Sequence, residues 1–226
     1  GDPMKFQKLS TLGPLAALAA LLVLAPAADA ANIETVARQA ILIDDTTGAV
    51  LFEKNADERM ATSSMSKVMT MYMVFDRLKS GRLSLDDTLP ISEHAWRTQG
   101  SKMFVELGNS IRVEDLIRGV IVQSGNDAAV ALAEGLAGNE DAFAAAATKR
   151  AHELGMTNTS LANADGMPDP NHYSTARDLA TLAHHVIKDF PEYYHYFSEI
   201  DFTYHGIKQG NRNPLLYRNM GVDGLK

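Results

Sequence analysis

Apolar and polar positions alternate in short runs near both ends of the chain. Residues 39–44 and 49–53 are apolar runs on either side of a turn that contains Gly48, and this pattern predicts a β-hairpin. A second hairpin is expected over residues 202–208, where Gly206 suits the turn. The segments between these hairpins have helical rather than alternating spacing.

The longest apolar segment, residues 64–79, has apolar side chains all round a helical wheel and is followed by Gly81. It predicts a buried central helix, with its methionines as core filling. Further helices are expected over residues 113–123, 127–137 (with Asn126 as N-cap and Gly138 as the closing residue), 139–154 and 175–188. Strands at both ends of a block of helices predict a layered α/β or α+β fold.

The N-terminus has the pattern of an export signal. Residues 1–3 precede Met4 and are interpreted as a remnant of cloning. Two lysines, an apolar stretch over residues 15–25 and an Ala-Asp-Ala sequence at 28–30 predict a cleaved signal peptide. The apolar stretch is shorter than the ~20 residues that span a bilayer. We therefore expect residues 1–30 to be removed and residues 31–226 to form one exported domain.

Composition excludes several classes of function. The 226 residues carry 21 Lys+Arg against 28 Asp+Glu, a net charge of -7, which argues against a general nucleic-acid binder. No cysteine is present, so disulfides, thiolate metal sites and cysteine nucleophiles are excluded. The adjacent His184 and His185 lack the H-E-x-x-H spacing, and Asp169 and Asp178 lack the ligand pattern of a calcium loop. We expect no metal and no cofactor.

Two short motifs carry candidate chemistry. Ser64 and Lys67 are three residues apart, on one face of the central helix, where a desolvated lysine can deprotonate a serine. Ser124 and Asn126 lie in a polar turn between two apolar helical segments, so their side chains are expected to face a cleft. Each motif alone is common by chance, and the plain alternatives are an ordinary helix face and an ordinary turn.

The order of the motifs is more specific than either motif. Ser-x-x-Lys, then Ser-x-Asn, then a late Lys226 resembles the three-motif layout of penicillin-recognising serine enzymes. From residue 39 to residue 226 the chain resembles the D-alanyl-D-alanine carboxypeptidases, which are low-molecular-mass penicillin-binding proteins. The resemblance implies an α/β fold of the β-lactamase/transpeptidase type, an antiparallel sheet flanked by helices. In that family the third motif continues Lys-Thr-Gly, so residues 31–226 are expected to be a partial domain, incomplete at the C-terminus, inactive and prone to aggregation alone.

The resemblance also implies a mechanism and its residues. Ser64 is the expected nucleophile towards the D-Ala-D-Ala end of peptidoglycan stem peptides, and Lys67 is its base. Ser124 is expected to relay a proton to the leaving amine, Asn126 to bind the substrate amide and Lys226 to supply positive charge near the substrate carboxylate. β-Lactam antibiotics are the expected inhibitors, and nucleic acid is not an expected partner. The expected location is the periplasm or cell envelope, and membrane association through a segment beyond Lys226 is left open.

Two alternatives belong to the same fold. A class A β-lactamase deacylates through a glutamate between the second and third motifs. Residues 160–175 contain no glutamate, which favours the peptidase. A non-catalytic cell-wall-binding homologue would lose the serine or the lysine, and this chain keeps both.

Overall fold

The computed structural model describes residues 33–226, of which residues 36–226 form one compact unit. The predicted signal peptide over residues 1–30 lies outside the described residues. None of the helices described is long and apolar enough to cross a membrane.

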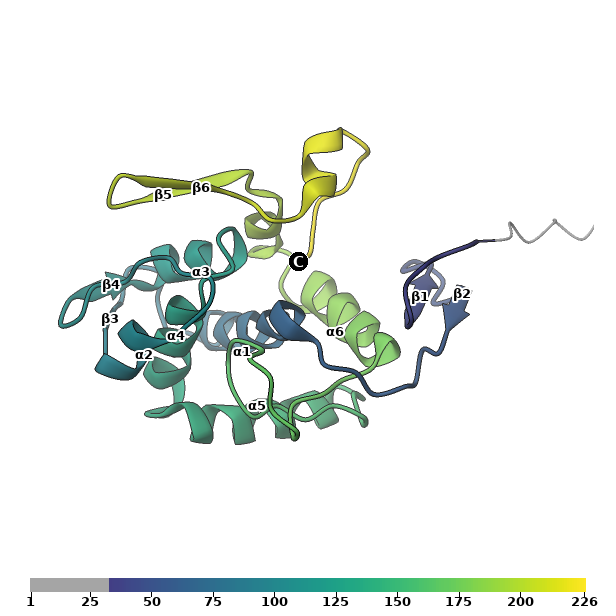
Figure 1. The fold of residues 1–226 in the computed structure, drawn as a ribbon, viewed down its shortest axis with the longest axis horizontal. Helices are drawn as coiled ribbons and strands as arrows, with labels where there is room; N and C mark the ends of the chain where they lie inside the picture. The colour runs from purple at the N-terminus through teal and green to yellow at the C-terminus, as the bar shows by residue number, and fades with distance from the viewer. Residues whose placement is uncertain (1–32) are drawn as a thin grey trace, which may run out of the picture. The chain divides into compact units, whose positions relative to one another are not determined.

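The described elements alternate between helices and two-stranded sheets (Figure 1). The α-helices are α1 (Lys67–Lys79), α2 (Glu93–Arg97), α3 (Val113–Ile121), α4 (Asn126–Ala137), α5 (Glu140–Glu153) and α6 (Ala176–Asp189). The 3-10 turns are η1 (Ser63–Ser66), η2 (Tyr194–Ser198) and η3 (Pro214–Arg218). The strands are β1 (Ala40–Ile43), β2 (Val50–Lys54), β3 (Thr88–Pro90), β4 (Ser110–Arg112), β5 (Asp201–Tyr204) and β6 (Ile207–Gly210).

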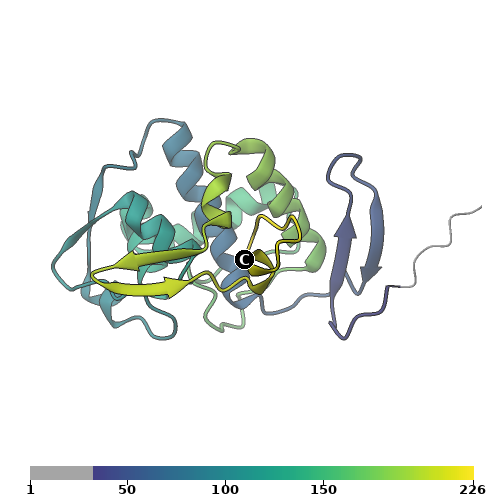
Figure 2. The same ribbon diagram turned by 90° about the horizontal axis from the view of Figure 1, so that it is seen from above.

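Helix α1 is the centre of the helical layer, with α3, α4, α5 and α6 packed around it (Figures 1 and 2). Most of its apolar residues are buried, and Val74 and Phe75 are fully inaccessible. Burying a side chain of this size contributes about 1.5–3 kcal/mol, so the helix is held rigidly in the core. The predicted central helix is confirmed, but the α-helix begins at Lys67 and the preceding residues form the turn η1.

Both predicted hairpins are confirmed. Strands β1 and β2 pair antiparallel, and β1 also contacts α6. Strands β5 and β6 pair antiparallel across a two-residue turn in which His205 and Gly206 both have positive φ, of 46° and 78°. Two positive φ values in succession are typical of the tight turn whose twist matches that of the strands.

A third antiparallel pair, β3 with β4, was not predicted, and neither was the short helix α2. Among the described residues the strands therefore form three separate two-stranded sheets. Residues 222–226, which end in the Lys226 of the third motif, have no regular secondary structure in the part of the chain that the structure describes.

Candidate active site

Ser64 lies in η1, immediately before the central helix. Ser63 takes a positive φ of 47°, an unusual conformation for a residue with a side chain, and this bend precedes the serine. Gly166 packs directly against the same turn, because a Cβ on Gly166 would lie 1.8 Å from the Ser63 carbonyl oxygen. The segment around Gly166 thus packs against the turn that contains Ser64.

Lys67 is the first residue of α1 and is fully buried. Its Nζ atom lies 3.1 Å from Ser64 Oγ and donates a 2.6 Å hydrogen bond to the Asp165 carbonyl oxygen. Burial lowers the pKa of Lys67 to about 8, although the nearby Asp165 carboxyl opposes this change. A substantial fraction of neutral amine is therefore available to accept a proton near neutral pH.

Ser124 completes a cluster of three polar side chains. It lies in the turn between α3 and α4 with a positive φ of 57°, and its Oγ atom donates a 2.9 Å hydrogen bond to Ser64 Oγ. The expected proximity of Ser64, Lys67 and Ser124 is confirmed as geometry. Lys67 and Ser124 come from distant parts of the sequence and thus meet at the hydroxyl of Ser64.

Asn126 was expected to cap the second of the two helices, and this was wrong. Helix α4 begins at Asn126 itself, and Gly125 is the N-cap. The Asn126 side chain instead donates a 2.7 Å hydrogen bond from Nδ2 to the Gln99 carbonyl oxygen, and its backbone N–H donates to the Ser101 carbonyl oxygen. The Asn126 side chain therefore connects α4 to the loop over residues 99–101 and does not cap its own helix.

The neighbouring Asp127 was not singled out in the sequence. It is fully buried, and its carboxylate accepts hydrogen bonds from the backbone N–H groups of Met103, Phe104 and Val105, at 2.8–3.1 Å. A carboxylate with this many backbone donors fixes the loop that faces the Ser124 turn. The sequence signal that could have indicated this role of Asp127 is an aspartate directly after Ser-Gly-Asn.

Lys226 reaches the same region from the end of the chain. Its Nζ atom donates to the carbonyl oxygens of Val120 and Ile121 at the end of α3, at 3.1 and 3.0 Å. Burial, then the proximity of Lys67 and Arg212, lowers the pKa of Lys226 to about 7. The amine therefore carries only part of a positive charge at neutral pH.

Arg212 is a second residue that the motifs did not reveal. Its Nη1 atom donates a 2.7 Å hydrogen bond to Ser101 Oγ, and its charge contributes to the lowered pKa of both Lys67 and Lys226. Its guanidinium thus adds a positive charge beside the cluster.

A polar groove runs along the outer side of the segment that contacts Lys67. It is lined by residues that include Gln99, Glu140 and Asp165. Glu140 accepts a 2.9 Å hydrogen bond from the Ala164 backbone N–H, and Thr70 Oγ1 donates to the Ala164 carbonyl oxygen at 2.6 Å. These bonds hold the Asp165 carbonyl in place on Lys67. Within residues 33–226, no group of three or more histidine or acidic side chains could hold a metal ion.

The geometry of these side chains indicates the class of protein. A serine at the start of a buried helix, with a desolvated lysine and a second serine at its hydroxyl, is the arrangement of a serine acyl-transfer site. The family model described as D-alanyl-D-alanine carboxypeptidase matches residues 25–226, and the chain belongs to that family.

Individual relatives agree with this assignment. The chain is 43% identical over 197 residues to the D-alanyl-D-alanine carboxypeptidase DacA of Haemophilus influenzae, a match that covers 85% of this chain and 50% of the relative. The crystal structure of penicillin binding protein 5 from Haemophilus influenzae is similar, with a TM-score of 0.83 and 43% identity over 86% of this chain and 58% of that one. Penicillin-binding protein D2 from Listeria monocytogenes, solved in its cefotaxime-bound form, has a TM-score of 0.77 and 30% identity over 86% of this chain and 80% of that one.

These likenesses confirm the predicted fold class, that of the penicillin-binding and β-lactamase-like proteins. The chain spans about half the length of the curated relatives that it matches.

Proposed function

We propose that the protein is a serine D-alanyl-D-alanine carboxypeptidase that acts on peptidoglycan stem peptides through an acyl-enzyme. The observation that carries this proposal is the meeting of Lys67 Nζ and Ser124 Oγ at the hydroxyl of Ser64, at 3.1 and 2.9 Å. Membership of the carboxypeptidase family supports the reaction class.

The proposed acylation uses the three side chains in turn. Neutral Lys67 takes the proton of Ser64 as Ser64 Oγ bonds to the carbonyl carbon of the penultimate D-Ala. The tetrahedral intermediate then breaks its C–N bond, and the leaving D-Ala amine takes a proton through Ser124, which Lys67 reprotonates. Water later cleaves the Ser64 ester and releases the shortened peptide. The Ser64 backbone N–H is the proposed first donor to the oxyanion, and loss of one such donor typically costs ~3 kcal/mol.

Substrate binding is assigned to the groups around this cluster. Asn126 Nδ2, which now bonds to the Gln99 carbonyl, is the proposed donor to the substrate amide. Lys226 remains the proposed partner of the substrate carboxylate, and Arg212 adds the charge that Lys226 loses as its pKa falls to about 7. A carboxylate would in turn stabilise the protonated form of Lys226.

β-Lactams are the proposed inhibitors because they would acylate Ser64 in the same manner. The cefotaxime-bound form of the Listeria monocytogenes relative supports this. The protein is further proposed to act in the cell envelope after export, because peptidoglycan is found there. Residues 31–226 are proposed to be part of the peptidase domain rather than a separate module.

The experiment that tests the proposal is covalent labelling by a fluorescent penicillin, in the protein at its natural length. Ser64→Ala removes the proposed nucleophile and should abolish labelling, while the thermal midpoint stays close to that of the wild type because the side chain is small. Ser63→Ala is the matched control and should still label. Labelling of the Ser64→Ala variant at the wild-type rate would mean that another residue is the nucleophile.

A further inference from the structure

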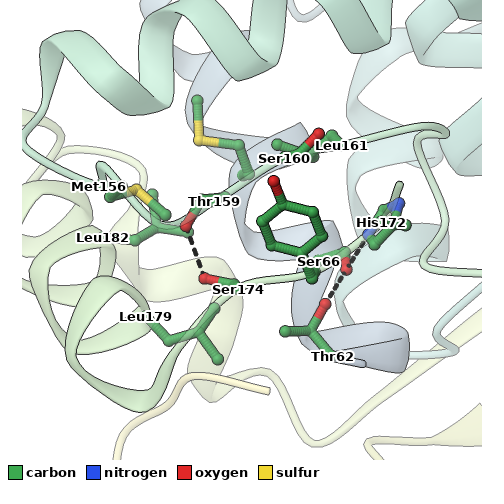
Figure 3. A pocket seen from close by; sticks show the side chains of 12 residues that line it. Thr62, Ser66, Met156, Thr159, Ser160, Leu161, His172, Ser174, Leu179 and Leu182 are labelled. Carbon is green, nitrogen blue, oxygen red and sulfur yellow. Dashed lines mark hydrogen bonds between the residues drawn. The ribbon is translucent and has the colours of Figure 1, made fainter. Parts of the chain in front are cut away.

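A buried histidine lies behind the nucleophile turn and has no part in the proposed chemistry. His172 Nε2 is 2.7 Å from Ser66 Oγ, and Ser66 Oγ is 2.5 Å from Thr62 Oγ1 (Figure 3). All three residues are buried, with exposed fractions of 6%, 4% and 3%. Ser66 is the last residue of η1, the turn that carries Ser64, and it directly precedes Lys67.

The partners of the ring fix its protonation state. His172 Nδ1 lies 3.1 Å from the Ala162 backbone nitrogen, and a backbone N–H can only donate. Nδ1 is therefore the acceptor, the ring is neutral, and its proton is on Nε2, where it is donated to Ser66 Oγ. His172 thus connects the nucleophile turn to the backbone at Ala162, in the segment that also supplies the Asp165 carbonyl to Lys67.

We propose that His172 is a positioning residue for the reaction, whose neutral ring ties the turn carrying Ser64 to the segment over residues 160–175. Protonation would place a second N–H on Nδ1, directly facing the Ala162 N–H. Two donors cannot bond to each other, so the bond from the Ala162 N–H that orients the ring would break, while Nε2 would keep its proton for Ser66. This inference rests on the proposed function, because it concerns the presentation of Ser64.

The surroundings of the ring favour its neutral form. Burial lowers the pKa of His172, and the charges of Asp169 and Glu140 only partly oppose this change. Asp169 belongs to the same segment and Glu140 to α5, while the partners from the η1 side, Ser66 and Thr62, are uncharged. The bond from Ala162 to the ring is therefore formed at neutral pH and is lost only as the pH falls through the lowered pKa of His172.

Two substitutions separate the donor role from simple packing. His172→Gln keeps an N–H donor and an oxygen acceptor but cannot be protonated, whereas His172→Leu removes both. His195→Gln is the control, because His195 is exposed and its ring bonds to the Glu192 carbonyl oxygen of its own segment. All variants are compared in the protein at its natural length, with Ser64→Ala as the test of the nucleophile itself.

The readout is the rate of labelling by fluorescent penicillin between about pH 4 and pH 8, a range that extends below the usual histidine pKa, beside the thermal midpoint of each variant. We expect His172→Leu to label about 10- to 100-fold more slowly near neutral pH, since small displacements of a nucleophile have effects of this size. His172→Gln should label within about threefold of the wild type at neutral pH and exceed it increasingly in acid, where the wild-type ring becomes protonated.

Either of two results would overturn the inference: wild-type labelling by a folded His172→Leu variant, or a wild-type to Gln ratio that is constant across the pH range. If the His172→Leu variant does not fold, the pH dependence of the ratio between the wild type and His172→Gln tests the inference by itself. Labelling of Ser64→Ala would instead refute the proposed function, so the two failures can be told apart.

Discussion

Substitution of Lys67 by arginine separates proton transfer from positive charge. A lysine with a pKa of about 8 is roughly one-quarter neutral near pH 7.5, against about one part in a thousand at its usual pKa of 10.5. The lowered pKa thus raises the concentration of the base by about two orders of magnitude, equivalent to about 3 kcal/mol. Arginine keeps the charge but has a pKa above about 12, so it supplies almost no neutral form.

We therefore expect Lys67→Arg to slow acylation by penicillin at least about 100-fold near neutral pH. The assay is stopped-flow labelling from about pH 6 to pH 9. The wild-type rate should rise about tenfold per pH unit in acid and level off near the pKa of about 8. The rate is expected to rise with pH because the neutral amine of Lys67 is the active form, and its fraction increases as the pH rises.

Lys79→Arg is the matched control for this experiment. Lys79 ends the same helix and bonds to the Asp189 carbonyl oxygen at the surface, so its replacement should leave the rate unchanged. A folded Lys67→Arg variant that acylates within about tenfold of the wild type would refute the base assignment and leave Lys67 an electrostatic role. A wild-type rate that does not change between about pH 6 and pH 8 would refute it independently.

Two further predictions concern the segment that faces Lys67. Gly166→Ala places a Cβ 1.8 Å from the Ser63 carbonyl oxygen and should lower both the labelling rate and the urea unfolding free energy, the latter by more than ~2 kcal/mol. Gly155 also has a positive φ, but no atom lies near the position of an added Cβ. Gly155→Ala should therefore lower the unfolding free energy only through backbone strain. Equal losses in the two variants would contradict the packing argument. Asp165→Asn should leave the lifetime of the penicillin acyl-enzyme unchanged, measured by loss of label over time, because Lys67 bonds to the Asp165 carbonyl and the Asp165 carboxyl accepts from the Met167 N–H. A large change in that lifetime would favour the β-lactamase alternative.

The regular elements could be predicted because their patterns are long. The central helix and the four later helices have several turns each, and the two predicted hairpins have a glycine in the turn. Strands β3 and β4 have three residues each and α2 has five, which is too short for a recognisable period. Their positions are fixed by packing, with Leu89 opposite Ile111, and packing has no local signature in the sequence.

The sequence predicts the site residues that act through a side chain in a motif, but it does not predict those that act through a backbone group. Ser64, Lys67 and Ser124 were expected together from the order of the motifs, and their distances agree with that expectation. Asp165 contributes a carbonyl group, which every residue has, so no sequence pattern identifies it. Arg212 influences the amines through its charge from a distant part of the chain, and only the fold brings it near.

The two buried amines share one physical cause. The pKa of each is lowered mainly by burial, and the charge of Lys67 further lowers the pKa of Lys226. Positive φ values at Ser63 and Ser124 add strain in the same few residues. The rigid core around α1 offsets these unfavourable features, and a substitution that relieved the burial of Lys67 or the strain at Ser124 would stabilise the fold while removing a group that the proposed reaction needs.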